Sequence, residues 1–124
     1  MTDSTHGTFP ADHELLGFFE AEPAVLDPGM PWFYNTLDFK TARQGVLVQC
    51  RIAPAYGDID VRLNLPSGPE LARAELQAFR SFRLIVNAHG EILIATSDGK
   101  PPMLCLMLKP HVWLGVGNFE SVPP

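Results

Sequence analysis

Two aspartates at positions 58 and 60 are the first residues whose type and spacing could perform chemistry. Asp58 and Asp60 flank Ile59, so on an extended strand both carboxylates lie on one face. A pair at this spacing could bind a hard cation or act as an acid–base pair. A cation site needs further oxygen ligands, which no spacing in the sequence supplies. Because Arg62 follows on the same face, we interpret the pair as part of a solvated strand face.

Aromatic residues form the second set of candidates. Trp32, Phe33 and Tyr34 are consecutive, and in an extended segment Trp32 and Tyr34 share a face that Phe33 does not. One face of this segment must be core, and burial of most of the cluster is the preferred interpretation. The alternative is an exposed aromatic platform, which could bind a sugar, a peptide or another subunit. The predicted binding surface therefore comprises Trp32, Tyr34, Tyr56, Asp58, Asp60 and Trp113.

Nucleophiles and metal ligands give weaker signals. Cys50 and Cys105 lie in apolar runs and are predicted to be buried, reduced thiols, with a disulfide as the alternative. No Cys-x-x-Cys pair, Gly-x-Ser-x-Gly elbow or phosphate loop is present. The histidines follow no ligand spacing: they are His6, His13, His89 and His111. The sequence predicts no catalytic residue, no metal site and no cofactor.

The charge distribution bears on the partners. The formal net charge is −5, which argues against a general nucleic-acid binder. Residues 1–29 hold six acidic residues and no Lys or Arg, so this segment could present a negative face to a basic partner. No apolar run reaches the length of a membrane helix, and the N-terminus lacks a signal core. We therefore expect a cytoplasmic protein without membrane contact.

Short strands must position these candidates. The 12 prolines and 10 glycines favour many turns over long helices. The clearest alternation runs from Ile59 to Leu65, which indicates a half-buried antiparallel strand. Other strand-like runs are 32–39, 46–52, 82–86, 91–95, 103–108 and 111–116. The run 103–108 is apolar on both sides, so it is expected to be a central strand covered on both faces.

Two segments have helical features. Residues 12–20 place Leu15, Leu16 and Phe19 at helical spacing, which predicts a short N-terminal helix. Residues 69–79 fit both a helix and an alternating strand. The strand is preferred because strand-like runs lie on both sides, and the helix remains an alternative.

These patterns predict a single, mainly β domain: an antiparallel β-sandwich or partly closed barrel of about seven short strands. An α+β fold is the alternative if residues 69–79 are helical. The predicted divisions are an acidic N-terminal arm over 1–29, a β domain over 30–120 and a C-terminal tail over 121–124.

Two hypotheses of function follow. The first is a non-enzymatic protein-binding or regulatory module, for which the analogy is a small acidic protein, such as a toxin-immunity protein, that neutralises a basic partner. The second is a small-ligand-binding barrel, or an enzyme built on one, with the aromatic residues around its mouth. A homodimer is compatible with both. The sequence has the general character of small bacterial proteins and carries no motif that assigns it to a family.

Overall fold

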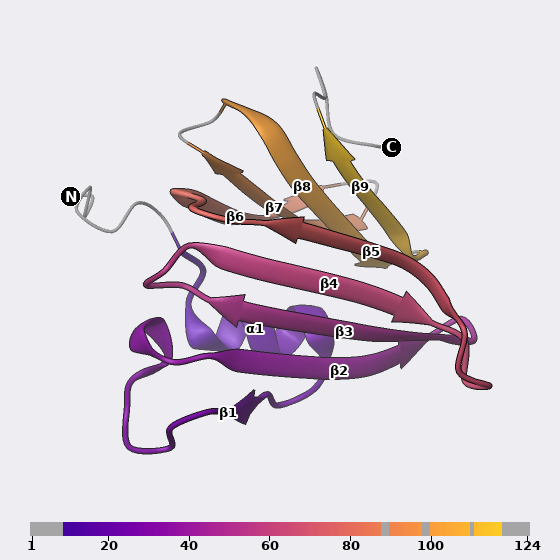
Figure 1. Cartoon of the computed structure of the whole chain (residues 1–124), viewed down its shortest axis with the longest axis horizontal. Coiled ribbons are helices and arrows are strands. Elements are labelled where there is room, and N and C mark those ends of the chain that lie inside the picture. The colour runs from indigo at the N-terminus through magenta and orange to yellow at the C-terminus, as the bar shows by residue number, and fades with distance from the viewer. Residues whose placement is uncertain (1–8, 88–89, 98–99, 110, 118–124) are drawn as a thin grey trace.

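The computed structural model describes residues 9–87, 90–97, 100–109 and 111–117. These residues form two antiparallel β-sheets, an α-helix and a 3₁₀-helix (Figure 1). The five-stranded sheet contains β1 (Ala24–Val25), β2 (Leu37–Arg43), β3 (Val46–Ala53), β4 (Asp58–Asn64) and β5 (Glu70–Leu76). The four-stranded sheet contains β6 (Ser81–Asn87), β7 (Gly90–Ser97), β8 (Lys100–Lys109) and β9 (Trp113–Gly117). In both sheets the spatial order of the strands is their order in the chain.

The inner face of the five-stranded sheet follows the period of two in its sequence. On β4, Ile59, Val61 and Leu63 are buried in the main core, while the residues between them point outward. Gln44 and Gly45 join β2 to β3, and both have positive φ, at 53° and 79°. Two such residues are typical of the tight turn that matches the twist of a hairpin.

The four-stranded sheet is apolar on both faces at its centre. β8 lies between β7 and β9, and its residues 104–108 are all buried. Leu104, Leu106 and Leu108 point into the main core between the sheets. Cys105 and Met107 point the other way and belong to a second cluster. The prediction of a central strand covered on both faces over 103–108 is confirmed for residues 104–108, and Met103 is partly buried.

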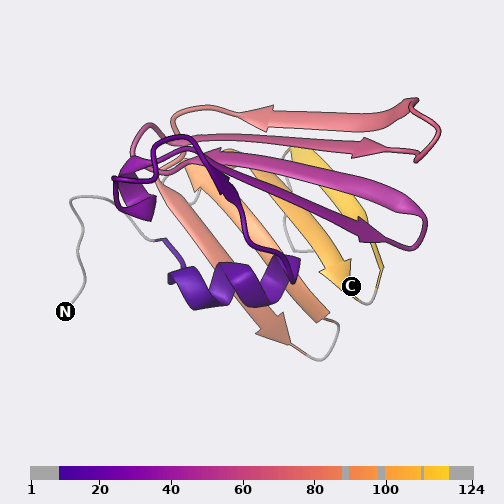
Figure 2. The same cartoon turned by 90° about the horizontal axis from the view of Figure 1, so that it is seen from below.

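The helix α1 (Asp12–Phe19) completes the core. Its first turn is held by a hydrogen bond from the backbone N–H of Ala11 to the Glu14 carboxylate, at 2.8 Å. The Phe19 ring stacks on Phe39 of β2, with centroids 4.3 Å apart. Figures 1 and 2 show α1 on the side of the five-stranded sheet that also faces the four-stranded sheet. Helix α1 therefore contributes three side chains to the main core of the sandwich, Leu15, Phe18 and Phe19.

Glu20, directly after α1, ties the helix to both sheets. Its carboxylate forms ion pairs with Arg43 of β2, at 3.0 Å, and with Lys109 of β8. The hydrogen bond from Lys109 and the positive charge of Arg43 lower the pKa of Glu20 below its usual value. One of the six acidic residues of the N-terminal segment is thus paired with basic residues of the same chain.

A close backbone contact at Gly57 joins the sheets. The Phe79 N–H donates a hydrogen bond to the Gly57 carbonyl at 2.8 Å, and the next N–H, of Arg80, bonds to the Thr96 carbonyl of β7 at 2.8 Å. Gly57 has a φ of +74°, and a Cβ there would lie 2.6 Å from the Phe79 carbonyl oxygen. Only glycine fits this position, where the β3–β4 turn touches the β5–β6 connection.

The fold confirms the predicted mainly β antiparallel sandwich and the short N-terminal helix. The partly closed barrel is wrong, because the described strands form two separate sheets. Residues 70–76 are a strand, so the second helix and the α+β alternative are also wrong. The described residues form nine strands rather than about seven. The predicted tail at 121–124 lies outside the described residues.

Candidate protein-binding surface

The outer face of the five-stranded sheet carries two cross-strand rows of side chains with opposite charge character. The strand register places one residue from each of β2, β3, β4 and β5 in each row. We call the first the acidic row, and it consists of Asp38, Arg51, Asp60 and Glu75. We call the second the basic row, and it consists of Lys40, Gln49, Arg62 and Arg73.

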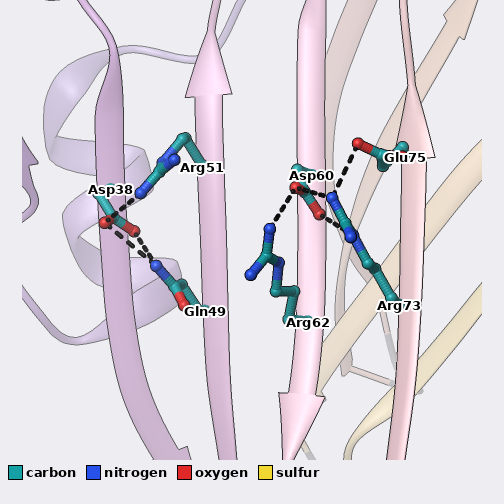
Figure 3. A network of polar contacts seen from close by, with 7 residues as sticks. All are labelled: Asp38, Gln49, Arg51, Asp60, Arg62, Arg73 and Glu75. Atoms are coloured by element: carbon teal, nitrogen blue, oxygen red, sulfur yellow. Dashed lines mark hydrogen bonds and ion pairs between the residues drawn. The ribbon is translucent and has the colours of Figure 1, made fainter. Parts of the chain in front are cut away.

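Asp38 anchors the β2–β3 side of this face (Figure 3). Its carboxylate accepts two hydrogen bonds from the Gln49 amide, at 3.1 and 3.2 Å. It also forms an ion pair with Arg51 at 3.3 Å. Both partners come from β3, one from each row. The contacts fix three side chains in place across the two strands.

Asp60 plays the corresponding part on β4 and β5 (Figure 3). Arg73 reaches it with two nitrogens, at 3.3 and 3.1 Å, and Arg62 reaches it with one nitrogen at 3.4 Å. Arg73 also pairs with Glu75 at 3.2 Å. The hydrogen bond with Asp60, and then its charge, raises the pKa of Arg73.

These contacts offset an unfavourable register. Directly opposite residues on β4 and β5 carry like charges, Asp60 facing Glu75 and Arg62 facing Arg73. Like charges directly opposite each other destabilise a sheet. On these two strands the charges are bonded diagonally, from Arg73 to Asp60, and along each strand, from Arg62 to Asp60 and from Arg73 to Glu75.

A shallow groove of about 300 Å³, which we call the acidic groove, lies at the end of the face that holds the acidic row. Tyr56, Asp58, Asp60 and Glu75 line it, together with Arg51. The Tyr56 side chain is the most exposed aromatic group there, at 77% exposure. Three of the six sequence-predicted surface residues, at positions 56, 58 and 60, therefore meet in one groove.

A larger groove of about 580 Å³ lies at the opposite end of the same face. We call it the basic groove, and its lining includes Lys40, Leu47, Arg62, Leu65 and Glu70. Sequence reasoning missed it, because the residues come from four strands and a turn whose register the sequence does not give. The one feature of the sequence that pointed to this groove was the outward position of Arg62 in the clearest alternating strand.

Residues 32–34 do not form the extended segment that the sequence predicted. Residues 32–34 form a 3₁₀-helix, η1 (Trp32–Tyr34), so their side chains do not alternate across a strand. Trp32 packs edge-on against Phe39 with centroids 6.1 Å apart, while Tyr34 is 53% exposed. The turn is held by Asn35, whose side chain bonds to the backbone of the preceding loop.

Trp113 lies on a different surface. It packs against the second apolar cluster on the outer face of the four-stranded sheet, with Ile92, Ile94, Cys105 and Met107. The face with the charge rows belongs to the other sheet. The six predicted residues therefore do not form one continuous surface.

Both cysteines are free and buried, as predicted, and the disulfide alternative is wrong. Cys50 is on β3 and Cys105 is on β8, in different clusters. Burial is the main cause that raises the pKa of Cys50, with smaller effects from Asp60 and Asp38. Burial also raises the pKa of Cys105, from 9.0 to about 11. Neither thiol has the lowered pKa of an activated nucleophile.

The described ranges contain no group of three or more His, Cys, Asp or Glu side chains placed to hold a metal ion. Nor does any helix in this part of the chain combine the length and the apolar character that a membrane crossing requires.

A solved structure provides the comparison with known proteins. The chain is similar to one chain of the contact-dependent growth inhibition toxin–immunity protein complex from Klebsiella pneumoniae 342, with a TM-score of 0.74 and 18% sequence identity. The similarity covers 89% of this chain and 95% of that chain. At this identity the match establishes a shared fold. No family model and no curated protein sequence matches the chain.

Proposed function

We propose that this chain is an immunity-type protein, which acts by binding a toxin and has no catalytic activity of its own. The observation that carries the proposal is the fold shared with one chain of a toxin–immunity protein complex over 89% of this sequence. The outer face of the five-stranded sheet supports it, because its side chains are fixed by ion pairs before a partner arrives.

The charge of the chain favours a basic partner. A net charge of −5 attracts a positively charged protein at long range and speeds the encounter. The acidic groove beside Tyr56 is a suitable contact for a Lys or Arg side chain, because Asp58 and Glu75 line it. A homodimer and a cytoplasmic location stay predictions from the sequence.

The ligand-binding barrel receives no support from the geometry. The space between the sheets is filled by large buried side chains, among them Phe39, Phe82 and Leu106. Of the four predicted aromatic residues, Tyr56 lines the acidic groove and Trp113 lies on the other sheet. The geometry therefore favours a protein-binding role over a ligand-binding barrel.

A growth assay tests the proposal. The chain would be produced in bacteria by itself, and then together with toxin domains: those encoded beside its own gene and that of the matched complex. We expect no growth arrest with the chain alone and restored growth with at least one toxin that arrests cells by itself. Growth arrest by the chain alone would make it the toxic member instead. If the chain protects against none of these toxins, the proposal is wrong.

A further inference from the structure

We propose that the basic groove holds an acidic side chain of the partner protein, with a neighbouring apolar side chain of the partner against Leu47 and Leu65. The inference rests on the proposed function, since it assigns part of the contact surface for the toxin. It also goes beyond a purely basic partner surface, because it requires a carboxylate at a defined place.

Lys40 is the first reason. It belongs to the basic row, it is exposed, and no ion pair joins it to any carboxylate in the described ranges. Asp38, two residues earlier on the same face of β2, has its carboxylate already bonded to Gln49 and Arg51. The Lys40 ammonium group is therefore available to an incoming anion.

Arg62 is the second reason. Its guanidinium makes one long contact, at 3.4 Å, to an Asp60 carboxylate that Arg73 binds with two nitrogens. An Arg fork can bind a carboxylate with two parallel hydrogen bonds. Arg62 therefore keeps donors for a second carboxylate on the side that lines the groove.

The apolar part of the groove is the third reason. Leu47 and Leu65 are 43% and 37% exposed, although the surrounding face is polar. Pro66 adds to the same lining, and the groove has a volume of about 580 Å³. That is enough space for a few side chains of a docked segment. Burying these leucines under a partner would remove apolar surface from water.

Glu70 sets the position of the incoming group. It lines the same groove but lies on β5, whereas Lys40 lies on β2, on the far side of β3 and β4. A partner carboxylate is therefore repelled from the β5 side and drawn toward Lys40 and Arg62. The acidic groove at the other end favours a basic group of the partner, so the two grooves together favour one orientation of the partner on this face. The partner is steered by net charge and oriented by the two grooves.

A peptide titration tests the groove without a toxin. The ¹⁵N-labelled chain would be titrated with acetyl-Ala-Leu-Glu-Leu-Ala-amide and followed by NMR. We expect saturable shifts at Lys40, Leu47, Arg62 and Leu65, with millimolar affinity. The matched peptide with Lys in place of Glu is expected to give no such pattern. No saturable shift at these positions, or equal shifts with both peptides, would overturn the proposal.

Charge reversal tests the groove with the protein partner that the growth assay selects. Lys40→Glu is expected to weaken binding by about tenfold and Lys40→Glu/Arg62→Glu by about a hundredfold. Arg83→Glu is the matched control, because it makes the same charge change at an exposed position on β6 and should change affinity less than about twofold. Thermal melts would confirm that the variants are folded.

The outcomes separate the two proposals. If wild type binds and protects but Lys40→Glu binds equally well, the groove assignment is wrong and the immunity function stands. If Lys40→Glu and Arg83→Glu weaken binding equally, only net charge matters and the groove is again wrong. If wild type protects against no toxin, the proposed function fails, and the peptide titration still decides whether the groove binds acidic segments.

Discussion

The outer faces of the two sheets differ in kind. On the five-stranded sheet the outward side chains form an acidic and a basic row, held by ion pairs. On the four-stranded sheet the outward side chains at the centre are Ile92, Ile94, Cys105 and Met107, and all four are buried. The five-stranded sheet therefore has an apolar inner face and a polar outer face, whereas the centre of the four-stranded sheet is apolar on both faces.

This difference separates recognition from stability. Exposed charges and their ion pairs contribute little to folding, so a polar face can be changed one residue at a time with little effect on stability. An apolar face that is fully buried contributes to folding like any other core. We therefore expect substitutions on the first face to change binding and substitutions on the second to change stability.

The largest expected effects are on β8. Leu106→Ala removes a side chain from the main core and Met107→Ala removes one from the second cluster. Because both are fully buried, each is expected to lower the free energy of unfolding by about 2–5 kcal/mol. Urea unfolding would measure both. A cost below about 1 kcal/mol for Met107→Ala would show that the outer cluster is not a core.

On β4 the two faces should differ sharply. Leu63 is 8% exposed and points inward, so Leu63→Ala is expected to cost an amount near the lower end of about 2–5 kcal/mol. Arg62→Ala, on the outer face, should cost less than about 1 kcal/mol. Denaturant melts of the two variants compare them directly. Equal costs at these neighbouring positions would contradict the half-buried strand.

The thiols should behave alike although they lie on different faces. An unfolded thiol ionises near its ordinary pKa of 9.0, while folded Cys105 keeps its proton up to about 11. The free energy of unfolding is therefore unaffected by this group below pH 9 and falls as the pH rises from about 9 to about 11. The loss is expected to reach about 1–3 kcal/mol.

Urea unfolding of wild type and Cys105→Ala across this pH range measures that loss. The variant should show a shallower decline, and Cys50→Ala provides the matching comparison on the inner face. Parallel curves for wild type and both variants would mean that the folded thiols ionise as freely as unfolded ones.

The smallest effect is expected within the charge rows. Arg73→Ala breaks the contacts with Asp60 and Glu75, which are partly exposed. It should lower the free energy of unfolding by less than about 1 kcal/mol, and added salt should reduce the difference. Melts at low and high salt, with Arg83→Ala beside them, would check this. A large, salt-independent cost would mean that the network is a core element of the fold.

The sequence was informative where burial alternates along a strand. The run around Ile59 and the doubly apolar run over 103–108 were predicted correctly, because one-sided and two-sided burial leave different patterns. The segment around Trp32 was misread, because strand propensity of aromatic residues outweighed the turn signals of Pro31 and Asn35. Local propensity does not include the side-chain hydrogen bonds of Asn35 that hold this turn.

The candidate surface could be predicted only in part. Tyr56, Asp58 and Asp60 are close in the sequence, so their meeting in one groove followed from a single strand and its turn. Trp113 was placed with them, but which sheet a distant strand joins depends on packing between layers. Lys40 was missed for the same reason, since its row with Arg62 exists only once β2, β3 and β4 are in register.

The sequential order of the strands has a consequence for how the chain reaches its native state. Each hydrogen-bonded strand pair in the described sheets joins consecutive strands, so each sheet is a single uninterrupted stretch of chain. A loop that closes over a shorter separation loses less entropy, and folding is faster when the contacting residues lie closer along the chain. The residues farthest apart in the chain meet where one stretch docks on the other, as in the ion pair between Glu20 and Lys109. We therefore expect a folding rate above that of a sandwich of equal length whose strands cross between sheets.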